Sequence, residues 1–508
     1  MRNFFYASFI FLVQMAGAAS WYVDNAATGS RNGTSWANAW TNLASVTGIS
    51  AGDTVYISGG STTKTYYLWG GSFREWVPAN YGSGTAGNRI TYKIGQEAGH
   101  NGVAIFDGTN APSAQGGGRF KVQGWKHGTI SGDYNGGNNI IVTNVESGSL
   151  LGDYASDVTV DHVTYYSGVR FNSATNIELS FCYIKPLTNA PDYCVFWGVY
   201  PSDENSTAFT NNVIRNCDLV APVSETTPAW GTDMIQGGKN SLVISNRFST
   251  YTIPLNTEWQ HTDGWQNLGN SYCRVEANDF LNIANYAIYW ECIGVSATNV
   301  WVINNVFRHT LTASASGSSI GVVIGPQGTS GKLFKNIIVA NNSFADWYGR
   351  LAIGMGQLTT TNTWEDSFVI NNLMVNCVPL QFFNSSPSVA NTVTNGISIL
   401  HNKAQAGADG NTTFTPGQLF TPGGGATIGF VDYTKLSAAN DLHLLSSDTA
   451  AIDLGYDLSA YFTTDADGNT RSGTWDLGAY EYVTPLSTYR GFQFGSGVQL
   501  IGPGRLTQ

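Results

Sequence analysis

A six-residue pattern that recurs between residues 158 and 374 constrains the fold of this chain more than any other feature. Each copy begins and ends on a mostly apolar residue, and its fourth residue is short and polar. The copies read VTVDHV (158–163), IELSFC (177–182), FTNNVI (209–214), VISNRF (243–248), VEANDF (275–280), VINNVF (302–307), VANNSF (339–344) and VINNLM (369–374). Repetition on this scale indicates stacked structural units, with loops of unequal length between them.

The fourth positions of the repeats form a polar column. Its members are Asp161, Ser180, Asn212, Asn246, Asn278, Asn305, Asn342 and Asn372. Stacked Asn amides can pair the backbone N–H and C=O groups that a chain leaves open where it turns between short strands. Parallel coils about 4.8 Å apart follow, eight to ten in number. The alternative is an antiparallel sandwich or propeller, but such folds do not usually keep one polar column over successive units.

These NNxF-type coils resemble the pectate-lyase-like superfamily of right-handed β-helices, which includes pectate lyases, polygalacturonases, alginate lyases and phage tailspikes. Two N-terminal segments, WYVDNAATGSRNGTSWANAWTNL with AGDTVYISGG and GTAGNRITYKIGQEAGHNGVAIFDG, are similar to those of secreted bacterial β-helix proteins, as is the C-terminal segment 441–482. The resemblance implies an all-β fold, a single-stranded right-handed parallel β-helix (solenoid). The β-helix, including its N-terminal cap, covers residues 21–425. A small closing module then spans 426–482, and the role of the tail 483–508 cannot be read.

The N-terminus and the composition indicate where the protein acts. Residues 1–20 contain Arg2, an apolar run from Phe4 to Val13 and then small residues, which predicts a secretory signal peptide and an extracellular or periplasmic location. The apolar run is shorter than the roughly 20 residues of a membrane span. The net charge of −11, without a block of Lys or Arg, argues against a nucleic-acid partner. The six cysteines lack metal-site spacing, and we interpret most of them as small buried apolar residues.

A second alignment, just upstream of the repeats, brings carboxylates together. It compares PDYCVFWG (191–198), GTDMIQGG (231–238), HTDGWQNLG (261–269) and NYAIYWECIG (285–294). Asp192, Asp233 and Asp263 stand at similar distances before a glycine, and Glu291 is a further carboxylate on the next coil. Carboxylates one coil apart would be about 5 Å from each other, which pushes one pKa upward. Such a pair can supply the acid and the base of glycosidic hydrolysis.

The HTDG segment resembles the NTDG element of polygalacturonases, from which only Asp263 carries over. The chain lacks the Asp-Asp pair on the following coil, the GHG and the RIK of that family, which argues against a polygalacturonase and leaves a related but different hydrolase open. His261 is predicted to tune or share proton transfer, and its alternative role is that of a hydrogen-bonded groove histidine. The aspartates have their own alternative, which is to cap turns or to hold structural calcium.

Aromatic and amide side chains surround the same segments. Flat rings with polar edges suit sugar rings, although tryptophans can equally fill the core. The residues predicted to bind substrate are Trp230, Trp259, Trp265, Trp290, Gln236, Gln266 and Arg308.

We therefore expect a secreted carbohydrate-active enzyme that cleaves the glycosidic bonds of an extracellular polysaccharide, with hydrolysis favoured. One alternative is a lyase, in which His261 or a groove arginine removes the proton beside a uronate carboxylate. The other is a non-catalytic, tailspike-like glycan binder. A hydrolase requires no cofactor, but Asp465, Asp467 and Asp476 could hold calcium; their alternative is to make turns.

Overall fold

The computed structural model describes most of the chain. The described residues are 17–68, 75–109, 119–145, 150–151, 153–166, 168–186, 193–198, 211–221, 233–250, 263–283, 285–310, 320–327, 331–347, 351–355, 362–382, 397–405, 421–422 and 427–483. Most of the predicted signal peptide and of the tail lies outside these ranges. Within them, helix is limited to two short 3-10 turns, η1 (Leu43–Ser45) and η2 (Pro78–Asn80). No helix of the described part is long and apolar enough to cross a membrane.

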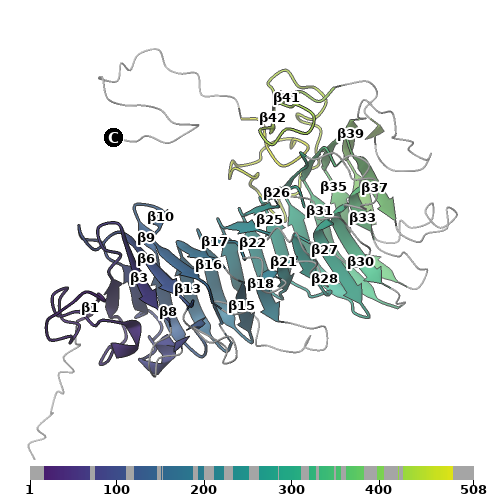
Figure 1. Cartoon of the computed structure of the whole chain (residues 1–508). Coiled ribbons are helices and arrows are strands. Elements are labelled where there is room, and N and C mark those ends of the chain that lie inside the picture. The colour runs from purple at the N-terminus through teal and green to yellow at the C-terminus, as the bar shows by residue number, and fades with distance from the viewer. Residues whose placement is uncertain are drawn as a thin grey trace, which may run out of the picture.

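Three parallel sheets run the length of the molecule, and each coil of the chain crosses sheet III, then sheet I, then sheet II (Figure 1). Sheet I orders β1 (Ser20–Val23), β2 (Thr54–Ile57), β5 (Ile90–Ile94), β8 (Lys126–Ser131), β13 (Ser156–Asp161), β16 (Thr175–Ser180), β19 (Asn212–Arg215), β22 (Ser241–Ile244), β25 (Cys273–Glu276), β28 (Ala297–Ile303), β31 (Leu333–Ala340), β35 (Ser367–Ile370) and β38 (Ile397–Leu400), with β34 (Thr363–Glu365) beside β31.

Sheet II orders β3 (Thr63–Tyr67), β6 (Val103–Asp107), β11 (Ile140–Thr143), β14 (Val163–Tyr165), β17 (Tyr183–Ile184), β20 (Asp218–Val220), β23 (Arg247–Ser249), β26 (Asp279–Leu281), β29 (Val306–Arg308), β32 (Ser343–Ala345), β36 (Leu373–Val375), β39 (Lys403–Gln405) and β40 (Thr421–Pro422). Sheet III orders β4 (Glu75–Trp76), β7 (Arg119–Lys121), β12 (Leu150–Leu151), β15 (Val169–Asn172), β18 (Tyr193–Gly198), β21 (Asp233–Gly237), β24 (Trp265–Asn267), β27 (Tyr286–Ile293), β30 (Ile320–Gln327), β33 (Leu351–Met355) and β37 (Val378–Phe382). Two hairpins are separate: β9 (Asp133–Tyr134) with β10 (Gly137–Asn138), and β41 (Phe430–Asp432) with β42 (Asp441–Leu444).

This topology confirms the parallel β-helix. A right-handed path is the one that twisted strands favour for parallel connections of this kind. Sheet I has 14 strands and begins at Ser20, so the segment predicted as a cap already contributes regular coils. The described part therefore holds more coils than the eight to ten predicted, because the N-terminal coils lack the Asn signal.

Apolar side chains that point into the coils form the core. Val243, Val275 and Val302 are in register in sheet I, and each is fully buried. In sheet II, the rings of Phe248, Phe280, Phe307 and Phe344 stack on one another with centroids 4.5–4.9 Å apart. Full burial of one such side chain stabilises the fold by about 1.5–3 kcal/mol. All six cysteines are buried, as was predicted for most of them.

A ladder of asparagine amides holds the turns between sheets I and II, as the polar column predicted. Each Oδ1 from Asn278 to Asn402 accepts both the backbone N–H and the Nδ2 of the preceding member, at 2.9–3.1 Å. The ladder consists of Asn246, Asn278, Asn305, Asn342, Asn372 and Asn402. Asn402 was not predicted.

The first three repeats were assigned to the wrong register. Val160 pairs with Leu179, Leu179 with Ile214, and Ile214 with Val243, so the ladder positions of these three coils are Val163, Cys182 and Cys217. The Cys217 sulfur accepts the N–H of Cys182 at 3.4 Å, and the Cys217 N–H donates to Asn246 at 2.9 Å. The predicted members Asp161, Ser180 and Asn212 instead lie in sheet I.

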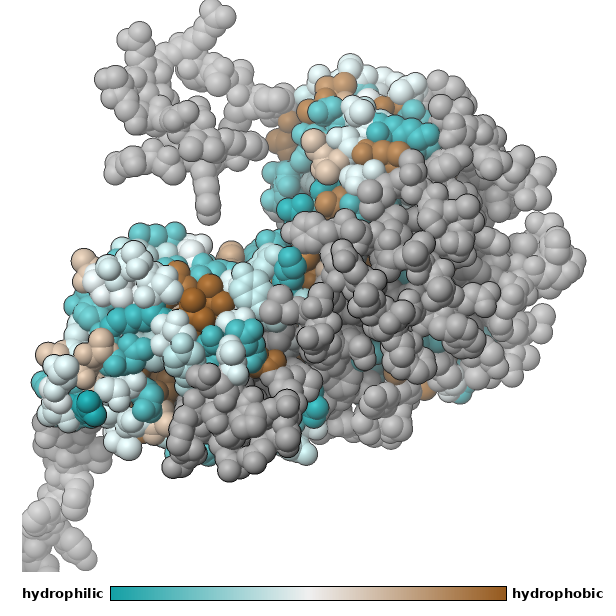
Figure 2. Space-filling model, in the orientation of Figure 1, coloured by the Kyte–Doolittle hydropathy of each residue, from teal (hydrophilic) through white to brown (hydrophobic). Residues whose placement is uncertain are grey.

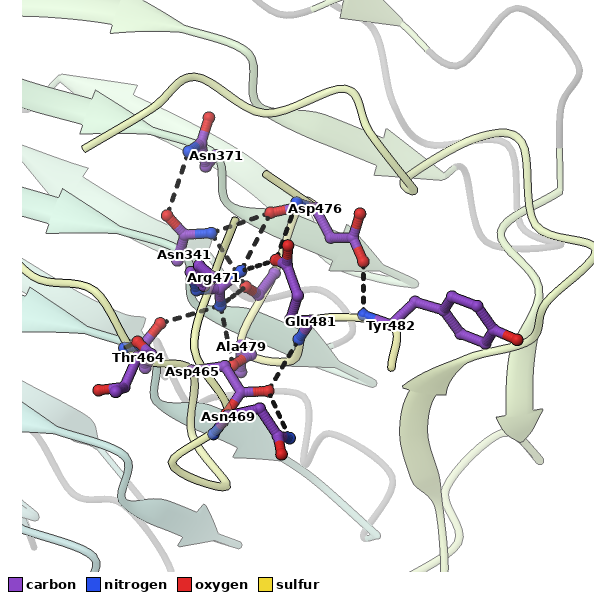
Figure 3. A network of polar contacts seen from close by, with 12 residues as sticks. Asn341, Asn371, Thr464, Asp465, Asn469, Arg471, Asp476, Ala479, Glu481 and Tyr482 are labelled. Carbon is purple, nitrogen blue, oxygen red and sulfur yellow. Dashed lines mark hydrogen bonds and ion pairs between the residues drawn. The ribbon is translucent and has the colours of Figure 1, made fainter. Parts of the chain in front are cut away.

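The closing module packs against the side of the solenoid, over the turns between sheets I and II (Figure 1). Buried Leu458, Phe462 and Trp475 cover the outer face of sheet I around Ile338 and Ile370. Figure 3 shows the polar part of this contact, which surrounds the guanidinium of Arg471. The module therefore fastens several coils together.

Candidate functional site

The outer face of sheet III carries a row of polar side chains in three consecutive coils. Gln236 of β21 is in register with Gln266 of β24, and Gln266 with Tyr289 of β27. Their strand neighbours Ile235 and Trp265 are fully buried in the core. Because successive side chains of a strand point to opposite faces, the row looks outward. Figure 1 places β21 and β27 near the middle of the solenoid.

Asp233 is the first residue of β21 and Asp263 lies two residues before β24, and the structure stacks them as the 30-residue spacing predicted. The Asp263 N–H donates to Asp233 Oδ1 at 3.3 Å, and the Tyr286 N–H donates to Asp263 Oδ1 at 3.0 Å. Both side chains are buried, Asp263 completely. Each aspartate therefore accepts a backbone N–H from the next coil, which is the turn-capping role that was their alternative.

The stack can be compared with the preceding coil through the register of β18. Tyr193 is the residue in register with Asp233, one position beyond the predicted partner. Asp192 itself lies outside the described residues, and so do the predicted site residues Trp230, Trp259 and His261.

Side-chain hydrogen bonds connect the row across three coils. Gln236 Nε2 donates to Asp233 Oδ2 and to Gln266 Oε1, each at 3.3 Å. Gln266 Nε2 donates to Glu291 Oε2, also at 3.3 Å. Glu291 was predicted to lie at the position on the next coil that corresponds to Asp263. Tyr286 occupies that position instead. Glu291 lies five residues further along β27, at the other end of the row.

Two tyrosines complete the row, and sequence reasoning missed them. The rings of Tyr286 and Tyr289 lie 4.5 Å apart, and Tyr289 is almost buried. Burial raises the pKa of both phenols, and the nearby charges of Glu291 and Asp263 raise it further. Both phenols therefore stay protonated at neutral pH and can donate a hydrogen bond. The segment YAIYWE carried the signal, since residues 286 and 289 lie five and two residues before the predicted carboxylate Glu291.

Two of the four tryptophans predicted to bind substrate, Trp265 and Trp290, fill the core, which corrects their predicted role. Trp265 and Trp290 are fully buried, with ring centroids 5.1 Å apart. Their indole N–H groups donate to the carbonyls of Gly237 and Asn270 at 2.7 and 3.0 Å. Neither ring offers a face to a sugar.

Arg308 is also not part of the row, contrary to the prediction. It lies on β29 of sheet II, where it forms an ion pair with Asp279 at 2.5 Å. Its Nη1 donates to the carbonyls of Ala438 and Asn440 in the closing module, at 3.0 and 3.1 Å. Arg308 therefore holds the module to the solenoid.

The aspartates proposed for calcium make protein contacts instead. Asp465 accepts backbone N–H groups of its own turn, and Asp476 accepts those of Asp453 and Tyr482 at 2.7 and 2.5 Å (Figure 3). Asp467 forms an ion pair with His443 at 2.8 Å. In the part of the chain that the structure covers, no group of three or more His, Cys, Asp or Glu side chains could hold a metal ion.

No protein-family model and no curated protein matches the sequence. The fold is similar to solved structures of a pectate lyase named Pel9A (TM-score 0.41, 13% identity, 92% of this chain and 97% of that chain) and of the PL6 family alginate lyase AlyGC (0.44, 10%, 80% and 55%). It is also similar to that of the GH136 lacto-N-biosidase from Eubacterium ramulus (0.40, 13%, 77% and 64%). At these identities a match says nothing about the reaction. The pairing of its own strands makes this chain a parallel β-helix, the architecture that the resemblance to the pectate-lyase-like superfamily implies.

Proposed function

We propose that the protein hydrolyses the glycosidic bonds of an extracellular polysaccharide on the outer face of sheet III. One observation carries the proposal: Asp233, Asp263 and Glu291 gather within three consecutive coils and share one network of side-chain hydrogen bonds and charge. Glycosidic hydrolysis needs a pair of carboxyl groups, one as the acid and the other as the base or nucleophile.

Burial assigns different roles to the three carboxylates. Glu291 is partly exposed, so we assign it to direct contact with the sugar. We assign the second carboxylate of the pair to Asp263 or Asp233, which are buried. Asp263 lies beside Tyr286, and Asp233 is hydrogen-bonded to Gln236. The neutral tyrosines and the amides of Gln236 and Gln266 can hydrogen-bond sugar hydroxyls without adding charge.

The same residues favour hydrolysis over elimination. A lyase needs a deprotonated base and a group that neutralises the uronate carboxylate. The raised pKa values of Tyr286 and Tyr289 keep both phenols protonated, and three carboxylates beside the row would repel a uronate. The lyase alternative therefore depends on His261, which lies outside the described residues.

Isosteric variants of the purified mature protein test the proposal. Asp233→Asn and Asp263→Asn keep an oxygen that accepts the backbone N–H of the next coil, so they remove the charge and retain the turn. Glu291→Gln likewise removes the charge and keeps an oxygen that accepts the hydrogen bond from Gln266. The control is Glu365→Gln, which alters only an exposed ion pair with Lys335 on sheet I.

We expect reducing ends to appear on neutral polysaccharides without the absorbance of unsaturated products. Glu291→Gln and at least one aspartate variant should lose about 10²-fold or more in rate, and the control should lose nothing. Absorbance of unsaturated products would show elimination and turn attention to His261. Glycan binding that every variant retains, with no turnover, would show a binding protein. A hydrolase that requires no cofactor should also keep its rate in EDTA; a loss would show that the activity requires a divalent cation.

A further inference from the structure

A second column of residues with left-handed backbone lines the corner where the chain passes from sheet III to sheet I. Strand register places its members in line from coil to coil. Asn, Asp and His adopt this conformation more readily than other residues that carry a side chain. The members are His127, Asp157, Asn176, Asn211, Asn240, Tyr272, Asn299, Asn336 and Asp366, with φ between 48° and 61°.

Tyr272 differs from the rest of this column. Its φ of 61° is the largest, and a bulky residue in this region is strained. In other coils the column gains amide hydrogen bonds, such as Asn211 to Asn176 at 3.1 Å, which a tyrosine cannot replace. The residue is 57% exposed, so little burial offsets the strain. The sequence thus keeps a large aromatic ring at a place where stability favours asparagine.

The position of Tyr272 relates the ring to the candidate site. It belongs to the coil of β24 and β25, the coil that carries Asp263 and Gln266. In the next coil, Trp290 is in register with Asn267, so Glu291 lies at the end of the row that leads toward this corner. On the coloured part of the face in Figure 2, hydrophobic patches are small and separate; the other exposed aromatic side chains in the described part of the solenoid, Tyr67, Tyr154 and Phe181, belong to other coils.

We propose that Tyr272 is a substrate-binding residue, whose ring stacks on a sugar of a polysaccharide that extends from sheet III over the corner to sheet I. The inference rests on the proposed function and adds to it a subsite for a neutral sugar ring. An aromatic face packs against the C–H face of a sugar, while the phenol edge stays in water. Strain at this position is then retained because it holds the ring outward beside the row.

Two effects of opposite sign test the inference. Tyr272→Asn relieves the strain, so we expect the melting temperature to rise by roughly 1–4 °C. The same variant should raise KM for a long polysaccharide by about threefold to tenfold at unchanged kcat. Tyr272→Phe retains the ring and should keep KM near the wild-type value. Phe181→Asn is the control, because Phe181 is also left-handed (φ 53°) and 47% exposed but lies at the corner between sheets I and II.

The outcomes separate this inference from the proposed function. A wild type that cleaves a polysaccharide, together with an unchanged KM in Tyr272→Asn, would overturn the role of Tyr272 alone. A lower melting temperature in Tyr272→Asn would overturn the strain argument. The same rise of KM in Phe181→Asn would show an effect not specific to this corner. If the wild type neither binds nor cleaves any glycan in affinity electrophoresis and the rate assay, both proposals fail.

Discussion

The asparagine ladder makes a quantitative prediction at Asn305, a buried member near its centre. Oδ1 of Asn305 accepts the backbone N–H of Asn278 at 3.0 Å and Nδ2 of Asn278 at 2.9 Å. Nδ2 of Asn305 donates to the carbonyl of Val275 at 2.9 Å and to Oδ1 of Asn342 at 3.0 Å. The substitution Asn305→Ala removes these four contacts, and the one from Nδ2 to the Ile303 carbonyl at 3.0 Å, while the coils above and below stay in place.

The cost follows from the groups that lose this partner in the interior. A buried polar group left without a partner costs about 1–3 kcal/mol, and Asn305→Ala removes the ladder contact of a backbone N–H and of a carbonyl. We therefore expect the free energy of unfolding to fall by about 2–6 kcal/mol. Urea unfolding followed by tryptophan fluorescence measures the loss, and hydrogen exchange at the Asn278 amide should become faster. The control is Asn216→Gly at an exposed left-handed position, which should change stability by less than about 0.5 kcal/mol. A loss in Asn305→Ala no larger than that of the control would refute the reasoning.

Three further predictions concern the module and the ladder. Hydrogen bonds to Asp467 and Asp441 raise the pKa of His443 from 6.5 to about 9; its stabilisation is complete below pH 6.5 and is lost as pH rises through about 9. The melting temperature of the wild type should thus fall more from pH 7 to 10 than that of His443→Gln, and parallel curves would contradict this. Cys217→Asn should extend the ladder by one member and raise the free energy of unfolding by about 1 kcal/mol in the urea assay; a decrease would argue against the register. Arg471→Met leaves buried acidic groups uncompensated and should cost about 3–5 kcal/mol, seen as faster proteolysis within 427–483; unchanged protection would contradict that role.

The sequence predicted the solenoid because its repeat reflects two requirements of the fold, an apolar residue for the core and a side chain that hydrogen-bonds the neighbouring coils. From Val243 onward, each repeat combines an inward apolar residue with an asparagine that pairs its neighbours, and the register is correct there. Upstream, Cys217 and Cys182 meet the second requirement with sulfur. The alignment therefore chose Asn212 of FTNNVI, five residues before the true ladder position Cys217. An asparagine is easy to recognise in the sequence, whereas a cysteine whose sulfur accepts the same hydrogen bond is not.

The candidate site could be predicted only in part. The spacing of Asp233 and Asp263 equals the length of one coil, so their stacking followed from the sequence. The place of Glu291 did not, because β27 spans Tyr286–Ile293 while β24 spans only Trp265–Asn267. An alignment at the glycines hides this difference in strand length. Burial of the tryptophans was equally hidden, since the sequence does not say which of two alternating faces a ring occupies.

The doubled asparagine of the later repeats serves two partners. The second asparagine of each pair points inward and joins the ladder, while the first is left-handed and points to the module. Asn304 donates to the Thr464 carbonyl at 2.8 Å, Asn341 to that of Asp476 at 3.0 Å, and Asn371 to that of Tyr456 at 2.8 Å. In the coils just upstream, Ala277 and Ser245 hold the same left-handed position with side chains too short for such contacts. The pairs at 304–305, 341–342 and 371–372 therefore lie in coils that the module covers, and in the last coil His401 takes the place of the first asparagine with a hydrogen bond to the Leu454 carbonyl at 3.0 Å.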